Sequence, residues 1–258
     1  MEVESIRNAD DTEIGEKTQR GNETVAAIVP ARGGSRGIPR KNIANVLCKP
    51  LIAYTIEVAG VTECIDRIIV STDDEEIREI SLKYGAEVPF LRPKELAQDN
   101  TPDKPVLIHA IKWLEENEGY IPKIVLNLRP TSPLRLSEDI EKVVKKMIST
   151  GCDSVRTVCQ VKHHPYWMKR LEGDRLMPFL EGKDERNYYQ RQLLPPTYRI
   201  NGCVDAIRRS VILKQDFLYG DDMRAVVMPA ERSHEVDAPM DLKIVEMLLK
   251  ERLRREQD

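Results

Sequence analysis

The stretch of the sequence that is richest in chemical groups is residues 28–42, IVPARGGSRGIPRKN, where an apolar run passes into glycines and cations. Glycine lets backbone N–H groups come close to an anion, while arginine and lysine add positive charge. A phosphate group is therefore the ligand that this loop favours. Its small residues are Gly33, Gly34 and Ser35, and its cations are Arg32, Arg36, Arg40 and Lys41.

Two common phosphate-binding motifs do not fit this loop. The segment GGSRGIPRKN lacks the GxxxxGK[ST] spacing of a Walker A loop, and Pro39 would interrupt a helix that started there. The segment also lacks GxGxxG, which argues against a dinucleotide. The alternative interpretation is a flexible surface turn with solvated cations. It is disfavoured because four cations directly follow an apolar strand.

A group of carboxylates near the end of the chain could hold a metal ion, which a transferred triphosphate needs. The segment HEVDAPMDL carries Glu235, Asp237 and Asp241 just before the last expected helix. Side chains at i and i+2 of an extended segment project to one side, as a Mg²⁺ site beside phosphates requires. The alternative is an acidic helix start, because Asp237 ahead of Pro239 suits an N-cap. Together with the glycine loop, the segment favours the metal site.

Strands and helices alternate over most of the chain, and this order positions the loop. The apolar strands are nearly continuous, which is typical of a mostly parallel sheet with helices on both faces. In such sheets ligands bind at the carboxyl ends of the strands, where the glycine loop follows the first strand. Expected strands are 24–31, 67–72, 86–90, 123–128, 153–161, 201–209 and 225–229, and expected helices are 49–60, 73–85, 103–117, 137–151 and 239–257.

The sequence divides into a tail, one domain and an insertion. Residues 1–24 are polar and aperiodic and are expected to form a flexible tail, so that the domain spans 25–258. The alternation stops near residue 163. The range 163–200 then contains an expected hairpin around EGDR and irregular sequence rich in arginine and tyrosine, which we interpret as an insertion.

Composition predicts a soluble protein whose basic site is local. The net charge is -3 and the pI is near 6.0, which disfavours nucleic-acid binding. No apolar run approaches the roughly 20 residues of a membrane span. The N-terminus lacks the apolar core of a secretory signal, and five scattered cysteines predict reduced thiols in a cytoplasmic protein.

Five motifs, in order, resemble those of the acylneuraminate cytidylyltransferases, also called CMP-sialic acid synthetases. They are AIVPARGGSRGIPRKNI, LRPTSPLR, KHHP, RQLLPPTYRINGCV and EVDAPMDL, and the resemblance covers residues 25–250. It implies a Rossmann-like, mostly parallel α/β fold of the nucleotide-sugar transferase type, dependence on Mg²⁺, and a homodimer formed through an inserted arm, here 163–200. It also implies transfer of CMP from CTP to the anomeric hydroxyl of a nonulosonic (nine-carbon, sialic-acid-like) α-keto sugar acid, with release of pyrophosphate.

The same resemblance implies roles for single residues. The implied catalytic residues are Arg32, Asp237 and Lys41, the last at the α-phosphate. The implied nucleotide-binding residues are Arg32, Gly33, Gly34, Ser35, Arg36, Asn42 and Arg92. The implied substrate-binding residues are Arg129, Arg191, Arg199, Asn201 and Asp205. Arginine suits a sugar acid because it binds a carboxylate bidentately. Asp237 is the implied main metal ligand, with Glu235 beside it.

Three positions depart from the family pattern. The chain has Arg129 where the family often has glutamine, Asp205 where it often has tyrosine, and Glu235 where it usually has aspartate. An Arg129–Asp205 pair across the pocket would be nearly charge-neutral. The first two departures leave the identity of the sugar open, whereas the third keeps a carboxylate for a metal ion.

Two alternative functions stay open. One is a cytidylyltransferase for an eight-carbon acid such as KDO, a family of similar fold whose members generally have LQGDEP-like sequence where this chain has LRPTSP. The other is a non-catalytic nucleotide-sugar-binding protein. Loss of Lys41 or Asp237 would favour that alternative, and both residues are present.

Overall fold

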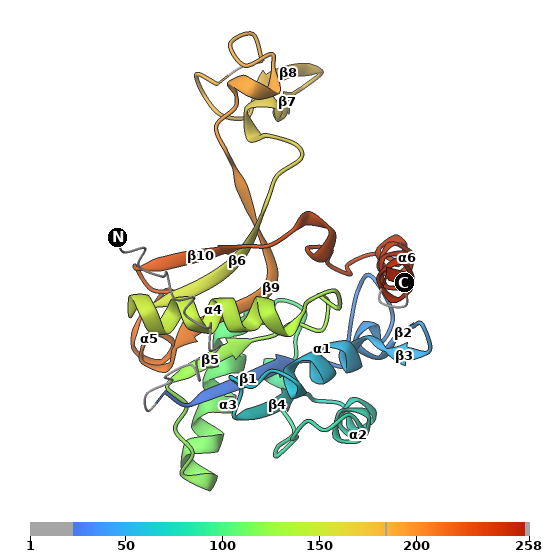
Figure 1. The fold of residues 1–258 in the computed structure, drawn as a ribbon, viewed down its shortest axis with the longest axis vertical. Coiled ribbons are helices and arrows are strands. Elements are labelled where there is room, and N and C mark those ends of the chain that lie inside the picture. The colour runs from blue at the N-terminus through green and yellow to red at the C-terminus, as the bar shows by residue number, and fades with distance from the viewer. Residues whose placement is uncertain (1–22, 184, 256–258) are drawn as a thin grey trace, which may run out of the picture.

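A six-stranded sheet forms the centre of the domain in the computed structural model, which describes residues 23–183 and 185–255 (Figure 1). The strand order is β10-β6-β9-β5-β1-β4, and within this sheet only β9 runs antiparallel to its neighbours. The mostly parallel sheet expected from the sequence is therefore confirmed. The strands are β1 (Val25–Pro30), β4 (Arg67–Ser71), β5 (Ile124–Asn127), β6 (Ser154–Gln160), β9 (Tyr198–Arg208) and β10 (Met223–Val227).

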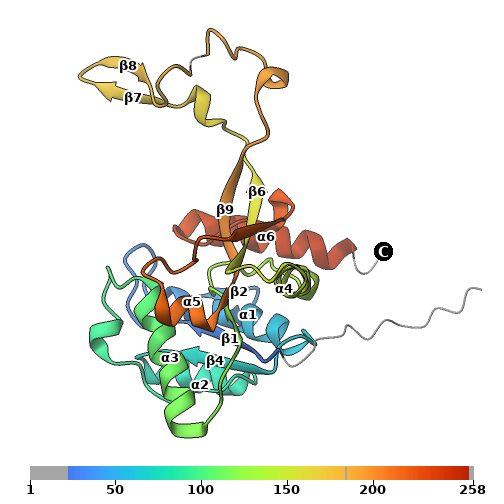
Figure 2. The same cartoon turned by 90° about the vertical axis from the view of Figure 1, so that its left-hand side faces the viewer.

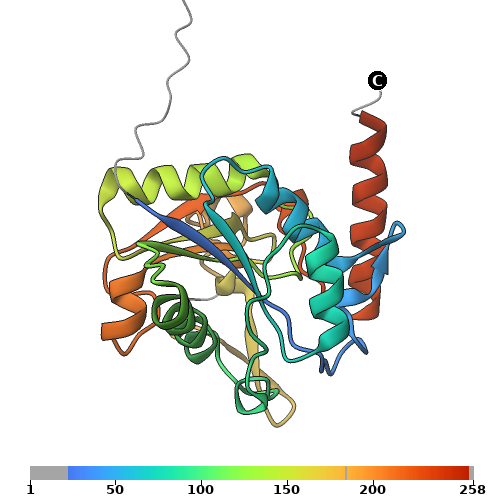
Figure 3. The same cartoon turned by 90° about the horizontal axis from the view of Figure 1, so that it is seen from below.

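Helices cover both faces of the sheet, as Figure 3 shows. One face carries α1 (Leu51–Gly60), α2 (Glu75–Lys83) and α4 (Ser137–Thr150), and the other carries α3 (Asp103–Glu118) and α5 (Arg209–Lys214). Burial on both faces explains why the strands are continuously apolar, since every residue of 25–29 is fully buried.

Two local expectations differ from the structure. The segment 86–90, AEVPF, is not a strand, because only isolated bridges form here, from Glu87 to Ile69 of β4 and from Leu91 to Thr72 just after β4. Pro89 lies between the two bridges and has no N–H to donate to a ladder, which explains the interruption. The short helix α5 was not expected, because its six residues are too few to show a helical period.

The last helix, α6 (Pro239–Arg255), lies to one side of the sheet (Figure 3). It packs Val245 and Leu249 into a small core with Val46 of the hairpin formed by β2 (Asn45–Val46) and β3 (Lys49–Pro50). This packing brings the segment before α6 against the loop that follows β5, where Val236 donates its N–H to the carbonyl of Thr131 at 2.8 Å.

The residues between β6 and β9 form an arm that projects from the domain (Figure 2). The outer parts of β6 and β9 make its stalk, and β7 (Lys169–Glu172) pairs with β8 (Arg175–Pro178) near its far end. The hairpin expected around EGDR is therefore confirmed. Its turn contains Gly173 with a φ of 68°, which a residue with a side chain would rarely adopt.

Residues 1–22 of the tail expected at 1–24 lie outside the described residues. Glu23 forms an ion pair with Arg208 at 3.0 Å, and the carbonyl of Thr24 accepts N–H groups from residues 123 and 124. These contacts join residues 23 and 24 to the domain. Within residues 23–183 and 185–255, no helix has the length and apolar character needed to span a membrane.

Candidate functional site

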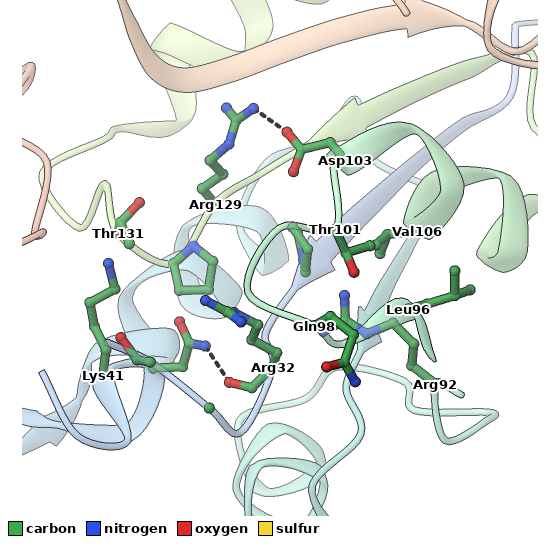
Figure 4. Close-up of a pocket in the computed structure, with 15 residues that line it drawn as sticks. Arg32, Lys41, Arg92, Leu96, Gln98, Thr101, Asp103, Val106, Arg129 and Thr131 are labelled. Atoms are coloured by element: carbon green, nitrogen blue, oxygen red, sulfur yellow. Dashed lines mark hydrogen bonds and ion pairs between the residues drawn. The ribbon is translucent and has the colours of Figure 1, made fainter. Parts of the chain in front are cut away.

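One pocket lies where the direction of strand addition changes. From β1 the sheet continues to β4 on one side and to β5 on the other, so the loops that leave β1 and β5 diverge at their carboxyl ends. Figure 4 shows the side chains that line the pocket between them. Those that the sequence had assigned to ligand binding are Arg32, Gly34, Ser35, Lys41, Asn42, Arg92 and Arg129. The volume of about 190 Å³ is below the 300–1,000 Å³ of typical ligand sites, so a nucleoside triphosphate would extend beyond it.

Glycines hold the β1 loop close to two other segments. Gly33 donates its N–H to Oδ1 of Asp73 at 3.0 Å. A Cβ at Gly37 would lie 2.4 Å from the backbone oxygen of Asp237, so no side chain fits at position 37. The buried Asn42 donates from its amide to the carbonyl of Arg32 at 2.9 Å (Figure 4). The loop expected to bind phosphate therefore lies directly against the carboxylate segment expected to bind a metal ion.

Asp99 holds two of the loop cations. Its carboxylate accepts hydrogen bonds from Arg32 and from Arg36. These bonds hold the pKa of the Asp99 carboxyl below its usual value, and the bond from Arg36 has the larger effect. Arg36 is 80% exposed, whereas Arg32 is 28% exposed and lines the pocket. Arg32 is thus a cation of the pocket wall that is paired with a carboxylate, whereas Arg36 lies outside the pocket lining and meets the same carboxylate from the exposed side.

Lys41 is the loop cation that is most firmly fixed at the pocket. Its Nζ donates to Oδ1 of Asp237 and to the carbonyl of Val236, each at 3.0 Å. The Lys41 side chain is 17% exposed, and its carboxylate partner is 72% exposed. An ammonium group is therefore held at the border between the β1 loop and the carboxylate segment.

Arg92 lines the pocket with donors that have no protein partner. The residue is 5% exposed, and its Nε and Nη2 lack hydrogen-bond acceptors among the residues that the structure describes. Burial lowers the pKa of Arg92, although the charge of Asp73 works against this effect. A buried donor without an acceptor costs about 1–3 kcal/mol. The arrangement therefore favours a ligand that brings acceptor atoms to this wall.

Arg129 is held by three acceptors at another wall of the pocket. Its Nη1 donates to Oδ2 of Asp205 at 2.9 Å and to the carbonyl of Gly202 at 3.3 Å, and its Nη2 donates to Asp103 (Figure 4). Burial disfavours the charge, but the carboxylates of Asp205 and Asp103 outweigh burial and raise the pKa of Arg129. The Arg129–Asp205 pair suggested by the sequence is present, and it gives the pocket a fixed guanidinium group.

Asp205 lies behind Arg129 and has no exposed surface. Its Oδ1 accepts a hydrogen bond from Nε of Arg156 at 2.9 Å, and its Oδ2 accepts one from the hydroxyl of Tyr219 at 3.1 Å. The Arg156 guanidinium also lies over the Tyr219 ring, 3.6 Å from its centre. Asp205 therefore acts on the pocket by holding Arg129, since its own carboxylate is enclosed.

Glu235 and Asp237 are the carboxylates that the sequence assigns to a metal ion. Residues 23–183 and 185–255 contain no group of three or more His, Cys, Asp or Glu side chains that could hold one. Burial, and then the charge of Asp237, raise the pKa of Glu235, as expected for two carboxylates that repel each other. Mg²⁺ is often held by one or two carboxylates and completed by phosphate oxygens and water. The donor set therefore fits a Mg²⁺ ion that binds together with a phosphate ligand.

The remaining residues assigned to substrate binding lie outside the pocket lining. Asn201 is buried and donates from its amide to Oγ of Ser233 at 2.8 Å, while Arg199 donates to the carbonyl of Ser233 at 2.6 Å. Both side chains thus support the segment that leads to Glu235. Arg191 is an exposed residue of the arm and is not brought to the pocket of its own chain.

Three residues that complete the site were missed by the sequence analysis. Asp99 lies in a polar stretch, QDNTPD, without any period, and Asp103 resembles an ordinary acid at a helix start. Arg156 did give a signal, because a charged residue in the otherwise uncharged strand SVRTVCQ needs a partner if the strand is buried.

Comparisons with known proteins show the family and the fold of the chain. Residues 26–251 match the family model described as Cytidylyltransferase. Similar relatives include the CMP-N,N'-diacetyllegionaminic acid synthase of Legionella pneumophila, 30% identical over 87% of this chain and 96% of that protein. The pseudaminic acid cytidylyltransferase of Campylobacter jejuni is 32% identical over 86% of this chain and 95% of that protein. A solved structure of CMP:2-keto-3-deoxy-manno-octonic acid synthetase complexed with CTP shares the fold, with a TM-score of 0.66 at 18% identity over 89% of this chain and 100% of that chain.

Replacement of Asp205 by alanine should lower the free energy of unfolding by about 3 kcal/mol or more, because Arg129 and Arg156 would keep charges without their shared carboxylate. Urea unfolding measures this change. The control Asp222→Ala removes a carboxylate from an exposed pair with Arg224 and should leave the midpoint nearly unchanged. An Asp205→Ala protein as stable as this control would contradict the role given to Asp205.

Proposed function

Because the chain belongs to the cytidylyltransferase family, we propose that it transfers CMP from CTP to the anomeric hydroxyl of a nonulosonic, sialic-acid-like α-keto sugar acid and releases pyrophosphate. The observation that carries the proposal is the contact of Lys41 with Asp237, which joins the cationic loop to the carboxylate segment at one pocket. Cations for phosphate oxygens and carboxylates for a metal ion are what nucleotidyl transfer requires. The two relatives named for acids of this class support the substrate class.

The reaction joins the sugar to the α-phosphorus of CTP. The anomeric hydroxyl oxygen attacks that phosphorus and forms a new phosphorus–oxygen bond. The bond from the α-phosphorus to the oxygen that bridges to the β-phosphorus breaks, and pyrophosphate leaves with its electron pair. The hydroxyl proton passes to solvent. The protein must therefore position the two reactants and stabilise negative charge on phosphoryl oxygens.

The residues of the pocket divide this task. Lys41, which is fixed by Asp237, would stabilise the charge on the α-phosphate. Arg32 lies on the same loop and would hold the phosphates that leave. Arg92 has unpaired donors for the nucleoside, and Arg129 presents a fixed guanidinium to the sugar acid. Mg²⁺ held by Glu235 and Asp237 would neutralise charge on the phosphates when bound.

The alternatives have less support. The KDO-type synthetase shares the fold at 18% identity, whereas the relatives at 30% and 32% identity are named for legionaminic and pseudaminic acid. A non-catalytic protein would not need to keep the contact between Lys41 and Asp237. The five cysteines all lie in the described residues and none of them forms a disulfide, which supports the cytoplasmic location expected from the sequence.

Pyrophosphate release with CTP, Mg²⁺ and a panel of α-keto sugar acids tests the proposal. We expect turnover with nonulosonic acids, and a lower kcat/KM for N-acetylneuraminic acid than for acids of the legionaminic or pseudaminic type. The reason is that Arg129, held by Asp205 and Asp103, presents a fixed polar group where the family often has glutamine, so the pocket should discriminate between sugar acids by their polar contacts to it. KDO serves as the control. Turnover of KDO alone would contradict the proposed substrate class, and N-acetylneuraminic acid as the best substrate would contradict the preference.

Substitution of Asp237 by asparagine should lower kcat/KM at saturating CTP by at least about 100-fold, because it removes a charge that holds Mg²⁺ while nearly preserving shape. A titration with Mg²⁺ should also show a higher metal requirement. The matched control Asp221→Asn changes an exposed aspartate away from the pocket and should behave as the unmodified protein. Near-normal activity of Asp237→Asn in Mg²⁺ would refute the metal site.

A homodimer formed through the arm is also proposed. Leu171 and Leu176 pair across the hairpin of β7 and β8 and are 70% and 68% exposed, and such apolar surface favours an interface. Light scattering at micromolar concentration should show a dimer. The double variant Leu171→Asp, Leu176→Asp should be monomeric, whereas Leu82→Asp on α2 should stay dimeric. A monomeric unmodified protein would refute the proposal.

A further inference from the structure

Arg40 belongs to the cationic loop, but it does not line the pocket. It donates two hydrogen bonds to the carboxylate of Asp74, at 2.9 and 2.8 Å, and a third to Glu76 at 2.7 Å. These acids lie at the start of α2, where the Asp74 side chain also accepts the N–H of Ile77 at 3.0 Å. The hydrogen bonds to Asp74 raise the pKa of Arg40. The charge of Arg40 is therefore paired with the acids at the start of α2 and is not part of the pocket.

The backbone of Arg40 has a left-handed conformation, with φ of 51° and ψ of 40°. Residues with a Cβ are strained in this region, and glycine is its usual occupant. The other described non-glycine residues with positive φ are Leu47 and Cys48. They form the two-residue turn between β2 and β3, where the geometry of the hairpin requires a positive φ. No hairpin surrounds Arg40. Its bonds to Asp74 are therefore the interaction that compensates the strain.

The conformation of Arg40 decides where the next residues point. Its carbonyl accepts the N–H of Ile43 at 3.0 Å, and this bond closes the short 3-10 turn of residues 41–43. Lys41 and Asn42 lie in this turn, and both line the pocket. A right-handed Arg40 would turn the chain in another direction and carry both side chains with it.

We propose that Arg40 and Asp74 are positioning residues, whose ion pair holds the left-handed backbone that directs Lys41 into the pocket. The inference rests on the proposed function, in which Lys41 acts on the transferred phosphate. The neighbouring Asp73 holds the start of the loop by accepting the N–H of Gly33. A Cβ at Gly33 would lie 2.8 Å from Oδ2 of Asp74, so the two aspartates enclose both ends of the loop.

Three variants separate the backbone role from a role of the charge. Arg40→Ala removes the ion pair and keeps the backbone strain, whereas Arg40→Gly removes both. Asp74→Asn removes the charge at α2 but keeps a good N-cap, since asparagine caps helices as well as aspartate does. The measurements are kcat and KM for CTP, together with hydrogen exchange of the Ile43 amide, which needs no activity.

Arg40→Ala should lose about tenfold in kcat and exchange the Ile43 amide about tenfold faster, the factor that corresponds to the cost of one left-handed residue. Asp74→Asn should change both measurements in the same direction but by less, because Glu76 still pairs with Arg40. The KM for CTP should change little, because the charge that Lys41 stabilises is greatest in the transition state. Arg40→Gly should stay within about threefold of the unmodified protein in both measurements, because glycine adopts the left-handed conformation without strain.

The proposal is overturned if Arg40→Gly loses as much kcat as Arg40→Ala, because the guanidinium itself would then be required. It is also overturned if Arg40→Ala and Asp74→Asn match the unmodified protein in both measurements. If the unmodified protein releases no pyrophosphate with any acid, the proposed function fails. Hydrogen exchange at Ile43 still decides the positioning role in that case.

Discussion

Each of the four cations of the β1 loop is paired with a carboxylate. The partners come from segments far apart in the sequence: Asp99 holds Arg32 and Arg36, Asp237 holds Lys41, and Asp74 holds Arg40. This pairing explains how a chain with a net charge of -3 maintains a basic site. Exposed ion pairs contribute little free energy, so a triphosphate can replace an exposed carboxylate such as Asp99 at small cost. The less exposed Asp74 additionally fixes the direction of the loop through Arg40.

The sugar end of the pocket depends on the strand that returns from the arm. Because β9 runs antiparallel between β5 and β6, Asp205 lies opposite Asn127 on one side and Arg156 on the other. Its carboxylate reaches Arg129 beyond the end of β5, and Gly202 adds its carbonyl where the register between β6 and β9 shifts. The two departures from the family pattern, at positions 129 and 205, are therefore one physical feature. A change at position 205 alone would leave Arg129 with Asp103 as its remaining carboxylate, and a change at position 129 alone would leave Asp205 with Arg156.

Much of the fold could be predicted because apolar periodicity and glycine stops are local signals. The helix at 137–151, for example, ends at Gly151 in a left-handed conformation, as its sequence indicates. The β1 loop was recognisable for the same reason. Asp99, Asp103 and the burial of Asp205 were not, because each depends on a partner more than twenty residues away. The conformation of Arg40 was equally hidden, since a left-handed arginine gives no compositional signal.

The central claim is that the pocket transfers the α-phosphoryl group of CTP, with its nucleoside, to a sugar acid. The most direct test follows two labels in separate reactions with an accepted nonulosonic acid. Label at the α-phosphorus should appear in a product that contains the sugar, and label at the γ-phosphorus should appear in pyrophosphate. Lys41→Ala should slow the appearance of both labels in these products by at least about 100-fold. Transfer of the γ-label to the sugar, or release of the α-label only as free CMP, would contradict the account.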